Sequence, residues 1–206
     1  ERCHQLGLEH AARLEAQGHR CYDVPMGGAS PVGSAAFIGG YLELMQQCEA
    51  AGIAPTRVYA ATGTGGTLAG LVAGHQALEA GPEIVGVAVS RKDEGYEGRC
   101  AALANASLAW LGSDVRVTAD DFTVDRGYFE PGYEQPNEAA NEAIRLLART
   151  EGLLTDPVYT GKALAGLLDH IRTGKIRPGE TVVFWHTGGA TALFAEQAIL
   201  GDLAER

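Results

Sequence analysis

The chain has 206 residues, and its 26 Asp and Glu against 16 Lys and Arg give a net charge of −10. Such an acidic chain lacks the positive surface that binds nucleic acid or anionic lipid, so neither is an expected partner. No apolar run approaches the ~18 residues that a membrane-spanning helix needs. Hydrophobic residues make up 46% of the chain and charged residues 20%, which favours a folded core over disorder. The length suits one large domain, or one and a half.

The pattern of apolar residues predicts alternating helices and strands along the whole chain. Gly18 and Gly52 mark the ends of the first two helices. In chain order, the elements expected in the first half are a helix at 4–17, a strand at 21–25, a glycine-rich loop at 26–34, a helix at 35–51, a strand at 57–61, a helix at 67–80 and a strand at 84–90. Those of the second half are a helix at 94–111, a loop-rich stretch at 115–136, helices at 137–150 and 161–172, and a strand at 181–186 with a short helix after it.

Continuous apolar strands separated by helices predict a doubly wound α/β fold, with a mostly parallel sheet and helices on both faces. Four predicted strands are few for such a sheet, and the first element is a helix with no strand before it. Both features lead us to expect that residues 1–206 form one incomplete domain, with an N-terminal part missing.

The cysteines are four in number and widely spaced, at Cys3, Cys21, Cys48 and Cys100. They form neither a CxxC pair nor the spacing of metal ligands, so we expect reduced thiols in the cytoplasm and no metal site. The chain begins at Glu1, and its first 18 residues lack the apolar core of a signal peptide. We therefore expect a piece of a longer protein.

The strongest chemical signal is ATGTGGTLAG at residues 61–70, between a predicted strand and a predicted helix. Glycines let the backbone approach a ligand, and the N–H groups of a helix N-terminus bind an anion. Thr64 and Thr67 add hydroxyl donors, so the composition favours a phosphate. The Walker pattern is absent, and the dinucleotide pattern GxGxxG fails at Leu68. A nucleotide-binding α/β domain and a tight turn without a ligand stay as alternatives.

This loop resembles the phosphate-binding loop of fold-type II pyridoxal-phosphate (PLP) enzymes, the tryptophan synthase β-like group. Three further segments are similar to motifs of the D-cysteine desulfhydrase and 1-aminocyclopropane-1-carboxylate (ACC) deaminase family: DPVYTGKA at 156–163, HTGGATALF at 186–194 and PGYEQPN at 131–137. The segments follow the family's order and cover nearly the whole chain, although the last departs from the family pattern at Glu134 and Gln135. The resemblance implies the large, PLP-binding domain of such an enzyme, with most of the small N-terminal domain absent.

The resemblance also implies a role for each matching residue. Tyr159 and Tyr133 would be the catalytic residues and would lie on either side of the substrate, as acid–base or orienting phenols. Thr187 is the first choice as hydrogen-bond partner of the pyridine nitrogen of PLP, and Thr160 is the second. The residues that would bind the cofactor phosphate, or allow its approach, are Gly63, Thr64, Gly65, Gly66 and Thr67.

Two of these positions bear on the branch of the family. ACC deaminases are expected to carry an acidic residue in place of Thr160 and an apolar one in place of Thr187. A neutral hydroxyl leaves the pyridine nitrogen less protonated, which is adequate for eliminating a good leaving group such as thiolate. The resemblance thus implies β-elimination from D-cysteine, giving sulfide, pyruvate and ammonia. ACC deaminase and L-cysteate sulfo-lyase stay as alternatives.

A PLP lyase holds its cofactor on a lysine, and this chain has only Lys92, Lys162 and Lys175. None has the family's context, in which that lysine and a Ser-Asn-His loop precede the phosphate loop. Lys162 is expected on a helix surface, and His186 is expected to pack or hydrogen-bond at a strand end. We therefore expect a fragment, inactive alone, of an enzyme that is a homodimer at full length. The alternative is a non-catalytic relative that binds a phosphorylated ligand or a partner chain.

Overall fold

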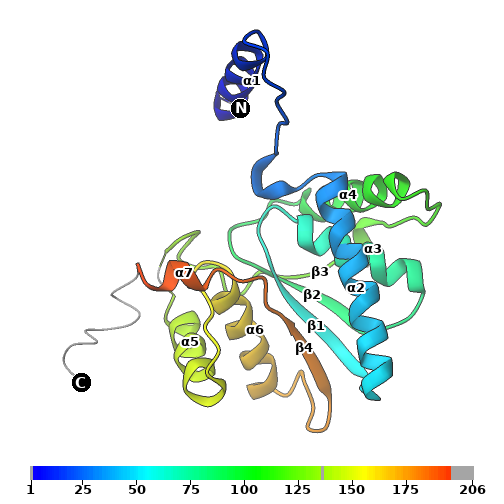
Figure 1. The fold of residues 1–206 in the computed structure, drawn as a ribbon. Helices are drawn as coiled ribbons and strands as arrows, with labels where there is room; N and C mark the ends of the chain where they lie inside the picture. Colours follow the sequence, from blue (N-terminus) through cyan, green and yellow to red (C-terminus); the bar gives the residue numbers. More distant parts are fainter. Residues whose placement is uncertain (1, 136, 196–206) are drawn as a thin grey trace.

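A sheet of four parallel strands forms the centre of the structure, a computed structural model that describes residues 2–135 and 137–195 (Figure 1). Its strands are β1 (Pro55–Thr62), β2 (Glu83–Ala88), β3 (Thr123–Asp125) and β4 (Thr181–Trp185), in the order β3-β2-β1-β4. The chain therefore moves outward from β1 to β3 and then returns to the other side of β1. Sheets of this kind bind ligands at the carboxyl ends of the strands, where the order reverses. Here that point lies between β1 and β4.

Helices cover both faces of the sheet. On one face lie α2 (Pro31–Ala51), α3 (Gly66–Leu78) and α4 (Tyr96–Trp110), and on the other lies α6 (Thr160–Arg172) with α5 (Glu138–Glu151) packed beside it (Figure 1). Successive residues of β1 alternate between the faces, so that Val58 and Ala60 join the first core and Tyr59 and Ala61 join the second. The predicted doubly wound α/β fold is confirmed.

Two glycines allow α3 to touch α2 along its length. A Cβ on Gly70 would lie 2.3 Å from the backbone oxygen of Ser34, and one on Gly74 would lie 2.9 Å from Cβ of Tyr41. Because interiors are close-packed, side chains at these positions would force the helices apart. Their contact brings the loops that precede both helices to one edge of the sheet.

The helix α2 begins at Pro31, earlier than hydrophobic spacing predicted. Ser30 caps it by accepting a hydrogen bond from the Gly33 N–H at 3.2 Å, and Pro31 occupies the first turn, where an N–H would have no helical partner. The loop expected at 26–34 is therefore shorter, and it includes a 3₁₀ turn at Met26–Gly28. The cap rather than the apolar pattern decides where this helix starts.

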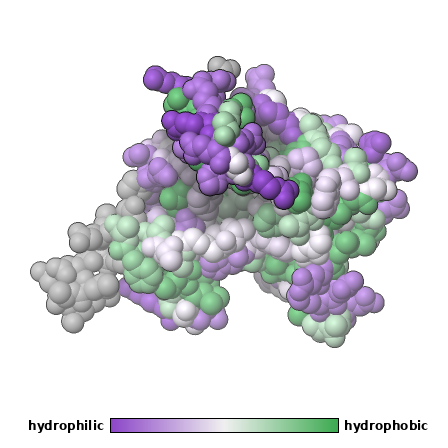
Figure 2. All heavy atoms as spheres, turned by 45° about the horizontal axis from the view of Figure 1, so that its top comes forward, coloured by the Kyte–Doolittle hydropathy of each residue, from purple (hydrophilic) through white to green (hydrophobic). Residues whose placement is uncertain are grey.

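The strand expected at 21–25 does not form. Within the described part of the chain no strand lies beside it, and an unpaired strand has no partner for its backbone hydrogen bonds. Tyr22 and Val24 are exposed there, and the preceding helix α1 (Arg2–Glu15) buries none of its residues. Figure 1 shows α1 standing apart from the sheet, and Figure 2 shows that its surface is mostly hydrophilic.

The stretch expected as a loop at 115–136 contains two short elements. One is a 3₁₀ helix, Ala119–Asp121, and the other is the edge strand β3, which pairs with β2 through Val85, Gly86 and Val87. A strand of this length is too short to show an alternation of apolar and polar residues, so it is recognised only by its pairing with β2. After β4 the chain forms α7 (Ala190–Leu193). No helix within residues 2–135 and 137–195 is long and apolar enough to cross a membrane.

Candidate functional site

A cleft of about 570 Å³ opens at the carboxyl ends of β1 and β4. Another side of it is formed by the segment before and within α2, including Met26, Gly27 and Phe37. The loops that follow parallel strands leave the sheet at the same edge, which explains why distant motifs converge here. All the predicted site residues except Thr160 line this cleft, namely Gly63, Thr64, Gly65, Gly66, Thr67, Tyr133, Tyr159 and Thr187.

The glycine-rich loop carries free backbone donors. The helix α3 begins at Gly66, and among the described residues no side chain caps the N–H groups of its first turn. Gly65 has a φ of 98°, and a Cβ there would lie 2.6 Å from Sγ of Cys100, so only glycine fits. These N–H groups, the helix dipole and the hydroxyls of Thr64 and Thr67 together suit a phosphate dianion.

Polar side chains that were not among the predicted site residues also support this loop. Lys92 Nζ donates hydrogen bonds to the Gly63 carbonyl oxygen at 2.7 Å and to Ser90 Oγ at 2.8 Å, and it lies 4.8 Å from the centroid of the Tyr96 ring. The hydroxyls of Tyr96 and Thr62 are 2.6 Å apart. Ser90 lines the cleft and Lys92 does not. Their place just after β2 was the available signal, because residues that follow a parallel strand lie at the ligand edge.

Tyr133 and Tyr159 lie next to each other in the cleft, and their hydroxyls are hydrogen-bonded. Their ring centroids are 5.8 Å apart and the planes are inclined by 75°. Burial, followed by the hydrogen bond with Tyr133, raises the pKa of Tyr159 to about 12. Tyr159 therefore keeps its proton at neutral pH and can donate a hydrogen bond, but it is not a ready base.

The start of α6 positions Tyr159. Asp156 is buried, and its carboxylate accepts hydrogen bonds of 2.8 Å from the N–H groups of Val158, Tyr159 and Thr160. These bonds cap the helix and compensate for the burial of the charge. A Cβ on Gly189 would lie 2.8 Å from the carboxyl carbon of Asp156, so the HTGG segment packs directly on the DPVY segment. An Asp three or four residues before a helix was the signal for this role.

Lys162 is fully buried, and the expectation of a surface position was wrong. Its Nζ donates to the backbone oxygens of Phe129 at 3.2 Å and Gly132 at 2.7 Å. Lys162 follows Tyr159 by one helical turn, and the two oxygens belong to the loop that carries Tyr133. Burial lowers the pKa of Lys162. At this position α6 contacts both the sheet and that loop, so the helix has no solvent face to which the side chain could extend.

The two candidate partners of a pyridine nitrogen separate in the structure. Thr187 lines the cleft, whereas Thr160 is buried and its hydroxyl donates to Oδ1 of Asp156 at 2.6 Å. The same hydroxyl oxygen accepts from the Asp156 N–H at 2.9 Å, so the hydroxyl of Thr160 is occupied by its hydrogen bonds with Asp156. His186 Nε2 lies 2.9 Å from the Leu154 backbone oxygen, which confirms its expected place as a hydrogen-bonding group at a strand end. Pro136 of the PGYEQPN segment lies outside the described residues.

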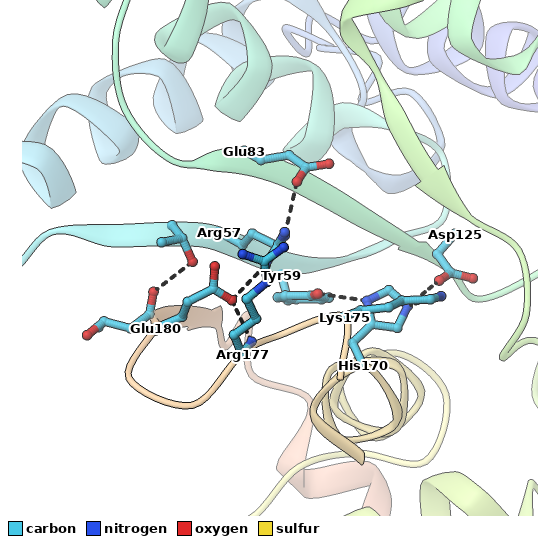
Figure 3. Close-up of polar contacts among 10 residues, drawn as sticks. Arg57, Tyr59, Glu83, Asp125, His170, Lys175, Arg177 and Glu180 are labelled. Atoms are coloured by element: carbon cyan, nitrogen blue, oxygen red, sulfur yellow. Dashed lines mark hydrogen bonds and ion pairs between the residues drawn. The ribbon is translucent and has the colours of Figure 1, made fainter. Parts of the chain in front are cut away.

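A second polar cluster lies between the sheet and α6, away from the cleft (Figure 3). The hydroxyl of Tyr59 is 2.7 Å from Nδ1 of His170, and Nε2 of His170 is 2.9 Å from Oδ2 of Asp125 and 3.0 Å from Nζ of Lys175. The sequence did not predict this cluster, whose members come from three distant elements. In the described ranges, no three His, Cys, Asp or Glu side chains gather so that they could hold a metal ion.

Solved structures with the same architecture define the class of this fold. A crystal structure of an ACC deaminase homologue superposes with a TM-score of 0.85 at 32% sequence identity, over 97% of this chain and 59% of that chain. O-ureido-L-serine synthase shares the fold at a TM-score of 0.52 and 15% identity, over 86% of this chain and 52% of that one. The fold is that of the fold-type II PLP enzymes.

The chain belongs to the family of pyridoxal-phosphate dependent enzymes, which it matches over residues 3–188. It is 44% identical over 185 residues to D-cysteine desulfhydrase of Salmonella typhi, and 43% identical over 187 residues to that of Klebsiella pneumoniae (strain 342). These matches cover 90% and 91% of this chain but 55% and 56% of the relatives. The chain thus spans about half the length of the curated relatives it matches. The uncapped start of α3, with a loop in which a Cβ would clash, fits the phosphate of the family's cofactor.

Proposed function

We propose that this chain is the large, cofactor-binding domain of a PLP-dependent lyase of the D-cysteine desulfhydrase type. The complete enzyme would eliminate sulfide from D-cysteine and leave pyruvate and ammonia. One observation carries the proposal: the phosphate loop at Gly63–Thr67 and the phenols of Tyr133 and Tyr159 line a single cleft. The identity of 44% to D-cysteine desulfhydrase supports the choice of substrate.

In this proposal each wall of the cleft has its own task. The donors from Thr64 to Thr67 bind the cofactor phosphate, and Thr187 provides a neutral hydrogen bond at the pyridine nitrogen. When bound, PLP supplies the electron sink that stabilises negative charge at the substrate α-carbon. A hydroxyl as the partner of the pyridine nitrogen suits elimination of a good leaving group. It therefore favours a reaction that expels thiolate over one that opens a cyclopropane ring.

The phenols hold protons in the cleft. Because the pKa of Tyr159 is about 12, its O–H group is a hydrogen-bond donor to a substrate carboxylate or to a departing sulfur. When the Tyr159 O–H group points to a ligand, the Tyr133 hydroxyl can donate its own proton to the Tyr159 oxygen. Asp156 fixes the backbone of Tyr159, and Lys162 fixes the loop of Tyr133, so the pair is oriented from both sides.

A lysine that could anchor the cofactor is not found in the cleft, since Lys92, Lys162 and Lys175 all lie outside its lining. We include in the proposal that the anchor and most of a small domain belong to other parts of the full-length protein, and that the chain alone is inactive. A homodimer and a small amino-acid substrate are parts of the same proposal. A cytoplasmic location also belongs to it and agrees with the free thiols of Cys3, Cys21, Cys48 and Cys100.

The test uses the protein expressed from its complete gene and compares D-cysteine with L-cysteine, L-cysteate and ACC. Equal amounts of sulfide and pyruvate from D-cysteine are expected. Ammonia with 2-oxobutanoate from ACC would instead favour the deaminase, which the TM-score of 0.85 to an ACC deaminase homologue makes the second candidate. Binding of PLP with no product from any of the four would support a non-catalytic relative and overturn the lyase.

A further inference from the structure

Lys92 is attached to the cleft through two of the groups that line it. Its Nζ donates to the Gly63 carbonyl oxygen at 2.7 Å and to Oγ of Ser90 at 2.8 Å, while Lys92 itself stays outside the lining. It reaches this position from the segment after β2, and it packs on the ring of Tyr96. The contact therefore joins two neighbouring strand ends behind the phosphate loop.

These two hydrogen bonds decide where neighbouring protons point. In a planar trans peptide the C=O and the following N–H point in opposite directions, so the Thr64 N–H points away from Lys92, and Thr64 lines the cleft. Ser90 Oγ uses a lone pair to accept from the ammonium, so its own proton must point elsewhere. Because Ser90 lines the cleft, that O–H group is available to a ligand.

The charge of Lys92 has no carboxylate partner among the described residues. In the described part of the chain its Nζ bonds a carbonyl and a hydroxyl, and no carboxylate lies within ion-pair distance. Burial, followed by the like charges of Arg126 and Arg99, lowers the pKa of Lys92, and the carboxylates nearby, Glu97 and Asp93, pair with those arginines rather than with Lys92. A half-buried ammonium without a counterion attracts an anion bound in front of it.

We propose that Lys92 is a positioning residue of the phosphate loop. It orients the Thr64 N–H and the Ser90 hydroxyl as donors to a phosphate monoester and supplies positive charge near that phosphate. Ser90 becomes an additional phosphate ligand. The proposal rests on the proposed function, because it deepens the phosphate site of the same cleft. It applies to any phosphate monoester dianion that enters the loop.

The test measures binding of pyridoxamine 5′-phosphate, which cannot form a Schiff base with lysine, and of pyridoxamine, which lacks the phosphate. Calorimetry on the full chain compares Lys92→Gln, which keeps a donor without charge, with Lys92→Arg, which keeps the charge. Lys175→Gln removes the same charge far from the cleft and serves as the matched control. Ser90→Ala tests the hydroxyl separately.

We expect Lys92→Gln to weaken pyridoxamine 5′-phosphate roughly tenfold, the scale of one charge acting over several ångströms at intermediate dielectric. Pyridoxamine affinity should not change, Lys92→Arg should recover binding to within about threefold, and Lys175→Gln should bind like the wild type. Ser90→Ala should cost about threefold for the phosphate ester only, as for one neutral hydrogen bond.

Unchanged phosphate affinity in Lys92→Gln, with binding intact in the wild type, would overturn the role of Lys92 and leave the proposed function standing. Equal losses for both ligands, without recovery by arginine, would assign Lys92 a merely structural role. If Lys92→Gln fails to fold, unchanged binding in Ser90→Ala still contradicts the proposal. No binding of pyridoxamine 5′-phosphate to the wild type would overturn both the inference and the phosphate site on which it rests.

Discussion

Two groups of tyrosines in this fold differ in what their hydroxyls can reach. Tyr133 and Tyr159 are 43% and 38% exposed and line the cleft, whereas Tyr59 is completely buried and bonded to His170. Burial raises the pKa of both Tyr159 and Tyr59 to about 12. A perturbed pKa therefore does not distinguish a site from a structural cluster here. Access to a cavity does.

The buried cluster shows why a chemically suggestive row of residues can be structural. Tyr59, His170 and Asp125 form a hydrogen-bonded chain, which Lys175 extends, and this chain ties the end of α6 to β1 and β3 (Figure 3). Its polar atoms use one another as partners. At the cleft, the first turn of α3 has backbone donors that no side chain within 2–135 and 137–195 caps. Polar groups that already have hydrogen-bond partners stabilise the fold, whereas donors without a partner can bind a ligand.

The largest effect should come from breaking the buried cluster. His170→Ala removes the partner of Tyr59, Asp125 and Lys175 at once and leaves buried polar groups unpaired. We expect the free energy of unfolding to fall by about 3 kcal/mol, measured by urea denaturation. His10→Ala on the exposed helix α1 is the control and should change it by less than about 0.5 kcal/mol. A loss for His170→Ala no larger than that of the control would contradict the structural role.

A smaller loss is expected at the cleft side of α6. Asp156→Ala removes the acceptor of the Val158, Tyr159 and Thr160 N–H groups, so it should lower the unfolding free energy by about 2 kcal/mol. Unlike His170→Ala, it should also weaken binding of pyridoxamine 5′-phosphate, because the cap packs on the Gly189 segment beside Thr187. Unfolding and calorimetric titration together separate the two regions. Destabilisation with unaltered ligand affinity would limit Asp156 to a structural role.

Lys162→Met should loosen a loop more than it alters global stability. Removing a buried charge offsets the loss of two hydrogen bonds, so the unfolding free energy should change by no more than about 1 kcal/mol. The loop held through Phe129 and Gly132 should open more often, and chymotrypsin cleavage after Tyr133 should accelerate roughly fivefold. Lys175→Met, a lysine change in the other cluster, should leave this cleavage rate unaltered. Equal cleavage rates in the wild type, Lys162→Met and Lys175→Met would show that Lys162 does not hold this loop.

Tyr133→Phe should lower the pKa of Tyr159 from about 12 without returning it to 10, because burial remains the first cause of the shift. An unfolded phenol ionises near pH 10, whereas folded Tyr159 keeps its proton up to about pH 12. Its contribution to stability is therefore complete below pH 10 and is lost as the pH rises through 12. Absorbance titration of phenolate, with Tyr159→Phe to assign the signal, gives the measurement. An unchanged pKa of Tyr159 in Tyr133→Phe would show that the two hydroxyls do not interact.

The smallest expected effect is on the lysines themselves. Incubation of the chain with one equivalent of PLP, followed by borohydride reduction, should leave no stoichiometric adduct on Lys92, Lys162 or Lys175. Mass spectrometry of the peptides checks this, and inorganic phosphate as a competitor identifies adducts that depend on the loop. A phosphate-sensitive, stoichiometric adduct at Lys162 would sink the proposal that the anchor lies elsewhere.

Local chemistry predicted the class of fold and most of the cleft. Continuous apolar runs predict the strands β1, β2 and β4, and glycines and threonines predict the loop at 61–70. Strand predictions from the sequence were wrong where pairing with another strand decides the structure. Residues 21–25 have strand composition but no neighbouring strand in the described part of the chain, and β3 is too short to show an alternation of apolar and polar residues. The start of α2 was misplaced because the cap at Ser30 outweighed hydrophobic spacing.

The sequence by itself indicated the kind of ligand, because the N–H groups and hydroxyls of a glycine-rich strand-to-helix junction suit a phosphate. Only the tertiary structure decided which polar residues are free to act. Thr187 and Thr160 are alike in the sequence, yet Thr187 lines the cleft and Thr160 is hydrogen-bonded to the buried Asp156. Lys92 and Lys162 look like surface lysines until the fold buries their stems and gives each a pair of oxygen acceptors. The reason is that burial and hydrogen-bond partners are set by segments far apart in the chain, which meet only when the sheet forms.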